Sequence, residues 1–246
     1  LGRYGLLRSL KSRGMNPFNV YRADEERIPA RFPVFLRGEN DHEGSLTGLL
    51  NTPADLAAKL ADMENAGIHR TRLLIIEYCD TRLESGYYRK YASFIVGNRL
   101  VARHRFTGSH WVLKDPEQSI GGLDDELAYV QRNPHAHILL PIFNNASISY
   151  GRIDYSLLNG KPVVWEINTN PMIATARIPG REAIEHHFVK NMLHAMDAVD
   201  FKNPHGRIVN PVYIGWADRG KRAVKQLVKN SPLPIGMKLR LKKIQK

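Results

Sequence analysis

The side chains best suited to metal or phosphate chemistry lie in residues 150–171, where carboxylates and an amide alternate with apolar residues. Asp154 falls on the polar face of one predicted strand, and Glu166 and Asn168 fall on the polar face of the next. The two strands flank Asn159-Gly160, a pair typical of the turn of a β-hairpin. Oxygen ligands of this kind suit Mg²⁺, which proteins usually hold through one or two carboxylates together with substrate phosphates.

The length of the turn decides whether the two carboxylates meet, because cross-strand partners share a face of the sheet. A two-residue loop, 159–160, would pair Asp154 with Trp165 and would turn the carboxylates to opposite faces. A three-residue loop, 159–161, would pair Asp154 with Glu166. We expect the three-residue loop and a metal-binding surface. The alternative is an edge hairpin whose polar residues simply face water.

The composition is that of a globular protein, and 246 residues can form one large domain or two small ones. No apolar run approaches the roughly 18 residues that span a bilayer, and no signal peptide is visible. Cys79 is the only cysteine, which excludes an intrachain disulfide and a cysteine-based zinc site. A cytoplasmic protein is the simplest interpretation, and Cys79 fits a buried structural thiol better than a nucleophile.

The positive charge of the chain is concentrated near its C-terminal end. The net charge is +12, and residues 219–246 contain ten Lys or Arg and no acid. Such a segment usually forms a solvated surface, and it could also contact nucleic acid, anionic lipid or an acidic partner. It does not define the activity of the rest of the chain.

The remaining periodicity predicts alternating strands and helices. Helices are predicted at 3–13, 124–132, 181–199 and from the capping sequence Thr52-Pro53-Ala54-Asp55 onward. Strands are predicted at 32–37, 73–78 and in a second hairpin, 87–96 and 99–106, that turns at Gly97-Asn98. Segment 138–145 stays open between helix and strand because it contains Pro141.

Two weaker patterns accompany these elements. Residues 38–48 contain three glycines and two hydroxyls after a strand, which suits a phosphate-binding loop, although an ordinary surface loop explains them as well. His186, His187 and His194 in the last predicted helix lack acidic or cysteine neighbours. We interpret these histidines as packing or solvent-facing side chains.

The order of these features resembles a known superfamily. A strand with a basic end runs into a glycine-rich loop, and an apolar strand ending in Glu-Tyr and a hairpin follow. Arg-Ile-Asp then stands twelve residues before Glu-Ile-Asn-Thr-Asn-Pro. This order, roughly from Phe32 to Pro171, resembles the ATP-grasp superfamily of carboxylate–amine ligases, and within it the glutathione synthetase and ribosomal-protein glutamate ligase group. The Asp-x₁₁-Glu-x-Asn pattern is its most specific part.

The resemblance implies an α+β fold in which two α+β subdomains with antiparallel sheets grip a nucleotide between them. The N-terminal domain that precedes this unit in the superfamily is expected to be short or absent. We expect a lead-in at 1–30, a small subdomain with the glycine-rich loop at 31–76, a C-terminal subdomain with the Mg-ATP site at 77–200, and a basic extension at 201–246.

The resemblance also implies roles for particular residues. The metal ligands would be Asp154, Glu166 and Asn168. The phosphates would meet Arg37, which stands where the superfamily has lysine, and the loop residues Gly44 and Ser45. Adenine and ribose would meet the linking segment, with Asp80 and Glu84 both candidates for the ribose-binding acid: Glu77, Tyr78, Cys79, Asp80 and Glu84. Arg89 or Arg103 would neutralise the transferred phosphoryl group.

The implied activity is that of an ATP- and Mg²⁺-dependent ligase that activates a carboxylate as an acylphosphate and joins it to an amine, releasing ADP and phosphate. The substrates would be small-molecule or peptide carboxylates and amines, which the sequence does not identify, and a homo-oligomer stays open. One alternative is a non-catalytic ATP-binding protein. Another is a nucleic-acid or anionic-surface binder that acts through residues 219–246.

Overall fold

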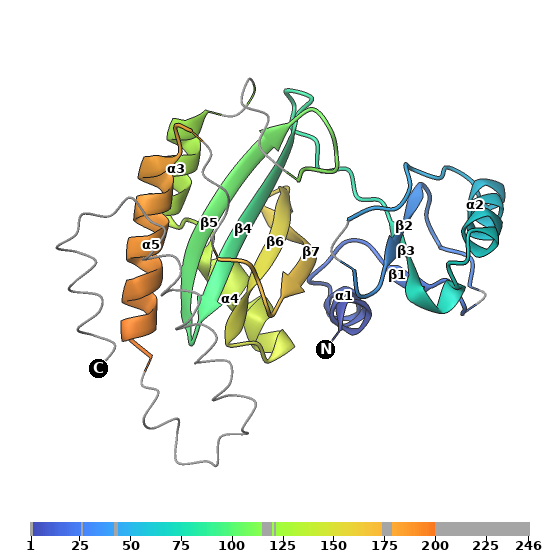
Figure 1. Ribbon diagram of the computed structural model, residues 1–246, viewed down its shortest axis with the longest axis horizontal. Helices are drawn as coiled ribbons and strands as arrows, with labels where there is room; N and C mark the ends of the chain where they lie inside the picture. Colours follow the sequence, from blue (N-terminus) through green and yellow to red (C-terminus); the bar gives the residue numbers. More distant parts are fainter. Residues whose placement is uncertain are drawn as a thin grey trace, which may run out of the picture.

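Two antiparallel sheets with flanking helices form the molecule (Figure 1). The computed structural model describes residues 2–25, 27–41, 44–114, 120, 122–173 and 179–199. The smaller sheet has the strand order β1-β3-β2, and the larger has the order β5-β4-β6-β7. The expected fold class, α+β with two antiparallel sheets, is confirmed. The basic segment 219–246 lies outside the described residues.

The small sheet combines β1 (Val20–Arg22), β2 (Val34–Gly38) and β3 (Leu73–Glu77). Helix α2 (Pro53–Asn65) packs on one face, and a 3₁₀ turn (Arg70–Arg72) leads into β3. The start of α2 follows the sequence signal, because Thr52 and Asp55 each bond the other's backbone N–H in a capping box. Strand β1 comes from the stretch expected to be a lead-in, so residues before 31 complete this sheet.

The large sheet consists of two hairpins, β4 (Tyr88–Val96) with β5 (Arg99–Gly108) and β6 (Tyr150–Leu158) with β7 (Lys161–Asn168). Helices α3 (Leu123–Arg132) and α5 (Glu182–Asp197) pack against each other and against β5. Helix α4 (Ala136–Ala146) settles segment 138–145 as helical, with Pro141 inside it. No described helix is long and apolar enough to cross a membrane.

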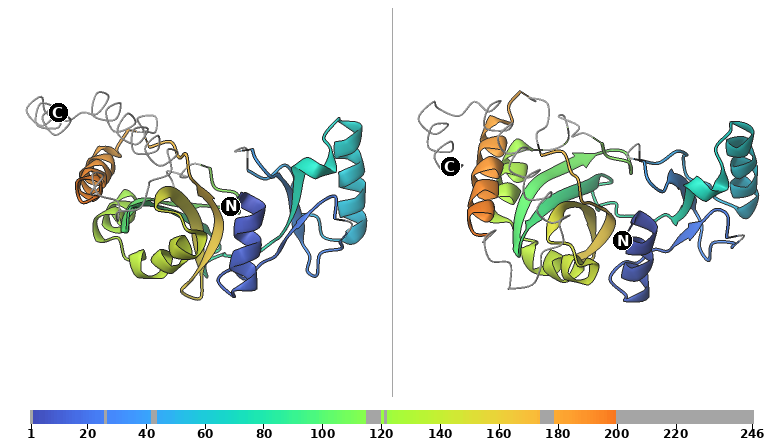
Figure 2. Two further views of the ribbon diagram at one scale, coloured as in Figure 1. Left: turned by 90° about the horizontal axis from the view of Figure 1, so that it is seen from below. Right: turned by 60° about the horizontal axis from the view of Figure 1, so that its bottom comes forward.

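Helix α1 (Arg3–Ser12) lies between the two sheets (Figure 2). Its Leu6 and Leu10 enter the core of the large sheet, whereas Leu7 joins a second cluster. That second cluster mixes buried side chains from both sheets and from α1: Leu7, Phe18, Val20, Phe35, Leu74, Ile76, Cys79 and Val163. Burial of this shared apolar surface holds the two sheets together.

Asn16 covers the free edge of strand β7 just after α1. Its Nδ2 donates to the carbonyl oxygen of Val164 over 3.0 Å, and its Oδ1 accepts from the Val164 N–H over 2.8 Å. One side-chain amide thus satisfies both backbone groups of an edge residue, which would otherwise be open to pairing with another strand. The same contact fixes β7 against the segment that connects α1 to β1.

Candidate active site between the two sheets

The β6–β7 hairpin has the expected register but reaches it through a different turn. Asp154 pairs with Glu166, and Arg152 pairs with Asn168, as expected. The three-residue loop is wrong: Leu158 pairs with Lys161, which leaves a two-residue turn. Asn159 and Gly160 both have positive φ, 51° and 74°, as a type I′ turn requires.

A β-bulge reconciles the short turn with this register. Pairing shifts between Asp154 and Tyr155, so that Trp165 is an extra residue on β7. A bulge turns two consecutive side chains toward one face, and Trp165 and Glu166 both line the cavity described below. Strict alternation would place Val164 on the polar face of Glu166 and Val163 on the apolar face of Ile167. The bulge reverses this near the turn: Val164 enters the core of the large sheet, and Val163 joins the cluster between the sheets.

Both expected metal carboxylates are bound to cationic side chains. Glu166 Oε2 accepts from Arg37 Nη2 and, over 2.9 Å, from Arg3 Nη2. Asp154 Oδ1 lies 2.8 Å from Arg152 Nε, and its Oδ2 lies 3.7 Å from Lys90 Nζ. The acids and bases of this cluster come from both sheets and from α1.

The charge of Glu166 is maintained by these neighbours. Burial opposes ionisation of the carboxyl, but the positive charges of Arg37 and Arg3 outweigh that effect and hold the Glu166 pKa below its usual value. Burial lowers the pKa of Arg37, and Glu166 opposes that shift. The site therefore holds ionised groups of both signs away from bulk water.

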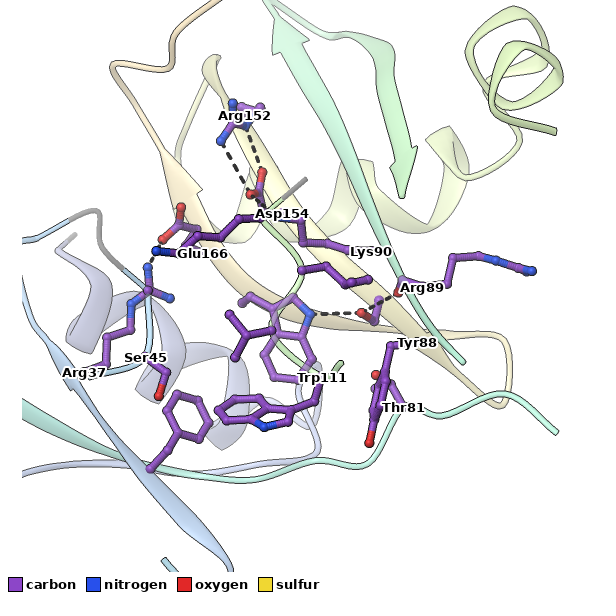
Figure 3. A pocket seen from close by; sticks show the side chains of 17 residues that line it. Arg37, Ser45, Thr81, Tyr88, Arg89, Lys90, Trp111, Arg152, Asp154 and Glu166 are labelled. Atoms are coloured by element: carbon purple, nitrogen blue, oxygen red, sulfur yellow. Dashed lines mark hydrogen bonds and ion pairs between the residues drawn. The ribbon is translucent and has the colours of Figure 1, made fainter. Parts of the chain in front are cut away.

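A cavity of about 370 Å³ opens beside this cluster, between the two sheets (Figure 3). Five of its lining residues are basic and two are acidic, so positive charge is in excess: Arg37, Arg89, Lys90, Lys114, Arg152, Asp154 and Glu166. A partly enclosed cavity with a net positive lining is suited to a multiply charged anion such as a polyphosphate.

The other end of the cavity is aromatic. Phe35 and Trp111 have ring centroids 4.9 Å apart, and Trp165 forms another part of the wall. Trp165 is held by a stack on Phe18 at 5.3 Å and by a 3.0 Å hydrogen bond from its Nε1 to Ser156 Oγ. Flat, fixed aromatic surfaces suit a planar ring such as a nucleobase.

Among the expected phosphate-binding residues, Arg37, Gly44 and Ser45 all line the cavity. Arg37 forms an isolated bridge with Ser45, which brings the glycine-rich loop back beside β2. Gly44 has φ of 90°, a conformation that favours glycine, and a Cβ there would meet only the Lys114 side chain, at 3.7 Å. The glycine at 44 is thus favoured by the conformation of the loop, which lines the cavity through Gly44 and Ser45.

The residues expected around adenine and ribose have other partners. The Glu77 carboxylate accepts hydrogen bonds from Asn19 N–H, Tyr21 and Arg31. These bonds outweigh burial and lower the Glu77 pKa. None of the five expected residues is among those that line the cavity: Glu77, Tyr78, Cys79, Asp80 and Glu84.

The linking segment nevertheless supports the aromatic end. Tyr78 packs edge-on against Trp111, with centroids 5.7 Å apart, and its hydroxyl lies 3.0 Å from that of Tyr88. The Asp80 carboxylate accepts from Arg82, which lowers the Asp80 pKa, and Glu84 is exposed. Cys79 is buried, and burial raises the pKa of its thiol, in keeping with the structural interpretation. The residues of this segment that reach the cavity are Thr81 and Tyr88.

The two expected phosphoryl-neutralising arginines differ in position. Arg103 is 2% exposed, lies 2.9 Å from Glu185 and covers the ring of Phe188, so it belongs to the packing of α5. Arg89 lines the edge of the cavity, but Figure 3 shows its side chain running away from Asp154 and Glu166. Asn168 shares the face of Glu166, and its Oδ1 accepts from the Asn170 N–H over 2.8 Å.

Several cavity or cluster residues were not assigned to the site from sequence, among them Arg3, Lys90, Trp111, Arg152 and Trp165. Arg152 had a readable signal, because it stands two residues before Asp154 and so shares its face. Tyr91 lies in the core of the large sheet, so its neighbour Lys90 points to the opposite face of β4, toward the cavity. This placement could be inferred only once the buried face of β4 was known. Arg3 reaches Glu166, and Trp111 reaches the cavity, through tertiary packing, for which the sequence carries no local pattern.

The donor set fits a divalent cation that also binds phosphate. Asp154 and Glu166 offer carboxylate oxygens on one face, and each already attracts cationic groups. Within the described ranges, no three His, Cys, Asp or Glu side chains gather as a metal site. An ion here would therefore be held by these two carboxylates together with phosphate oxygens. His187, one of the three histidines of the last predicted helix, lies 3.1 Å from the side-chain amide of Gln131.

Comparison with known proteins gives matches in structure only. No protein-family model matches the chain, and no curated protein matches it in sequence. The D-alanine–D-alanine ligase of Bacillus anthracis, solved in complex with ATP, matches at 13% identity and a TM-score of 0.47, over 80% of this chain and 67% of that enzyme. The L-amino acid ligase of Bacillus licheniformis matches at 13% identity and 0.44, over 75% of this chain and 42% of that one.

A third solved structure matches at a similar level. The pyruvate carboxylase of Rhizobium etli matches at 16% identity and a TM-score of 0.45, over 83% of this chain and 18% of that enzyme. These matched structures are ATP-grasp proteins.

Proposed function

We propose that the chain is an ATP-dependent ligase that activates a carboxylate and joins it to an amine. The observation that carries the proposal is the two-ended cavity between the sheets, which is aromatic at one end and has opposed carboxylates and an excess of cations at the other. A nucleoside triphosphate has the same two-part character, with a planar base and a polyanionic chain.

In the proposed complex the base stacks beside Trp111 and Trp165, and the phosphates extend toward Arg37 and Arg152. The guanidinium groups suit phosphate because they are planar, permanently charged and able to donate two parallel hydrogen bonds. Asp154 and Glu166 would hold Mg²⁺, which supplies further positive charge against the phosphate oxygens. Asn168 would complete that set as an additional oxygen ligand.

In this reaction the protein mainly positions the substrates and stabilises negative charge. A carboxylate oxygen of the substrate attacks the γ-phosphorus, the bond to the bridging oxygen breaks, and ADP leaves. An amine then attacks the acyl carbon, phosphate leaves, and the nitrogen loses a proton to give the amide. Lys90 and Arg152 lie beside Asp154, where they can offset negative charge on the reacting oxygens.

The test measures ATP binding and ADP release by the full chain with Mg²⁺ and a panel of amino acids and peptides. Wild type should bind ATP in a metal-dependent manner and release ADP with the correct pair of substrates. Asp154→Asn and Glu166→Gln should abolish the metal dependence. Asp125→Asn, which alters an exposed partner of Arg105 outside the cavity, is the matched control. Equal, metal-independent ATP binding by all four proteins would refute the proposal.

A specific observation favours a second candidate, a nucleotide-binding protein without catalysis. Both carboxylates are already paired with cationic side chains of the chain itself. If those pairs persist in the complex, the protein would bind nucleotide without recruiting a metal. Saturable ATP binding with no ADP release over the whole substrate panel, unchanged by chelators, would support this candidate.

A further inference from the structure

Arg3 joins three separate parts of the molecule around the candidate site. Its Nη1 donates to the carbonyl oxygens of Gly38 at 2.8 Å and Glu39 at 2.7 Å. Its Nη2 donates to the carbonyl oxygen of Asp41 and to Glu166 Oε2, both at 2.9 Å. One side chain of α1 therefore binds the start of the glycine-rich loop and a carboxylate of β7 at the same time.

The stability of α1 does not explain this placement. Arg3 is the first helical residue, where the positive end of the helix dipole disfavours a cation. The first turn contains no acid, and Gly2 provides no side-chain cap. The Arg3 side chain is only 9% exposed, so it also gives up most of its hydration. The contacts that offset these costs are those with residues 38–41 and Glu166.

Arg3 and the proposed metal ion would both bind the carboxylate of Glu166. Arg3 and Arg37 both bind its Oε2. A divalent cation added to that oxygen would be repelled by two guanidinium groups, so at least one of them has to move. Arg3 is the one with other acceptors close by, since three backbone carbonyls already hold it.

We infer that Arg3 is a positioning residue that competes with the divalent cation for Glu166. Without nucleotide it ties residues 38–41 to β7; with metal and nucleotide it leaves Glu166 while staying bound to those carbonyls. Arg3 thereby links the occupancy of the site to the contact between the two sheets. The inference rests on the proposed function, because it requires Glu166 to bind the metal.

The experiment titrates the full chain with Mn²⁺ alone and follows quenching of tryptophan fluorescence, since Trp111 and Trp165 line the cavity. Arg3→Gln should lower the Mn²⁺ Kd about tenfold, as expected for losing one charged competitor. Arg8→Gln is the matched control: it removes an arginine of the same helix whose side chain binds Asn19. Its Kd should stay within about twofold of wild type.

The outcomes separate the inference from the proposed function. Equal Mn²⁺ Kd values for wild type and Arg3→Gln would overturn the competition and leave the metal site in place. Saturable quenching in none of the proteins would show that the two carboxylates bind no cation without phosphate; it would overturn the competition between Arg3 and a free cation and leave the proposed function to the ATP-binding test.

A second measurement does not depend on the metal. Thermal unfolding of Arg3→Gln, Glu166→Gln and the double variant should show coupling, with the double variant losing less than the sum of the single losses. Additive losses would contradict the tie between Arg3 and Glu166. Should Arg3→Gln not fold, Arg3→Lys keeps the charge but lacks the fork geometry, and its Mn²⁺ Kd should fall by less than tenfold; an unchanged Kd would count against the inference.

Discussion

The two hairpins of the large sheet have the same local design and different surroundings. Each turns through two residues, Gly97-Asn98 or Asn159-Gly160, and each has one bulge on its second strand. The bulges fall at the same level of the sheet, because Ala92 beside the first pairs with Asp154 beside the second. The extra residue is Arg103 in β4–β5 and Trp165 in β6–β7.

What packs on each bulge determines the role of its extra residue. Arg103 is covered by α5, where Glu185 and Phe188 bind its guanidinium group. Trp165 faces the space between the sheets and, with Glu166, lines the cavity. A bulge changes the direction of a side chain, whereas the neighbouring layer decides whether the redirected side chain serves packing or binding.

The largest expected effect separates the arginines of the two regions. Arg37→Ala should weaken ATP binding about 10- to 100-fold, because it removes charged hydrogen-bond donors from the cavity. Arg103→Ala should leave ATP affinity unchanged and lower stability by about 3 kcal/mol, because the buried ion pair with Glu185 is broken. Calorimetric titration with ATP measures the affinity of both variants, and chemical denaturation measures their stability. Loss of affinity in Arg103→Ala alone would reverse the assignment of the two regions.

Replacement of the second bulge residue should affect both stability and binding. Trp165→Ala removes the stack on Phe18 and the bond to Ser156, and should cost roughly 3 kcal/mol of unfolding free energy. It should also weaken ATP binding, whereas Trp165→Phe should recover most of the affinity by keeping an aromatic surface. Denaturation curves and ATP titrations of both variants measure this. Equal ATP affinity for Trp165→Ala and wild type would remove Trp165 from the base site.

The first bulge should also give the stability of the protein a pH dependence. His104 is buried and stacks on Phe106 with centroids 3.9 Å apart. Burial, assisted by nearby cations, holds the His104 pKa well below 6.5: Lys90, Arg103, Arg152 and Arg181. Between pH 6.5 and that lowered pKa the unfolded chain binds the proton and the folded chain does not, so stability falls as the pH drops.

The expected slope is about 1 kcal/mol per pH unit below the ordinary histidine pKa. His104→Gln should flatten this part of the curve, measured by denaturation between pH 7 and 5. His135 has a pKa lowered mainly by burial and should contribute in the same direction, so His135→Gln serves as the comparison. An unchanged slope in His104→Gln would mean that the folded protein accepts the proton there.

The smallest expected effect distinguishes the two turns. Asn159 has φ of 51°, whereas in the first turn Gly97 is the residue with positive φ. Asn159→Ala should therefore cost about 1 kcal/mol and Asn98→Ala only a few tenths, measured by thermal unfolding. Equal losses at both positions would show that the two turns do not differ in the way described.

The sequence predicted the parts of the fold that local chemistry controls. Capping residues at Thr52 and Asp55, alternation in the strands and the two turn pairs all led to elements that the structure contains. The pairing of Asp154 with Glu166 was also predicted, but through a longer turn, because alternation alone cannot distinguish an extra loop residue from a bulge. Strict alternation also assigns Val163 and Val164 to the wrong faces, for the same reason.

The lining of the cavity was predictable only in part. Alternation placed Asp154 and Glu166 on one polar face, and the ATP-grasp resemblance suggested Arg37, Gly44 and Ser45; all five line the cavity. The contribution of Arg3 depends on α1 lying between the sheets, and the role of Arg103 depends on α5 covering its bulge. Both are consequences of long-range packing, which no window of the sequence encodes.

The central claim is that the cavity binds a nucleotide with its base at the aromatic end and its phosphates at the charged end. A crystal structure of the full chain with Mg²⁺ and a non-hydrolysable ATP analogue tests this most directly. We expect the base beside Trp111 and Trp165, the phosphates at Arg37 and Arg152, and the metal on Asp154 and Glu166. A nucleotide bound elsewhere, or bound here with both carboxylates still held by their arginines and no metal, would contradict it.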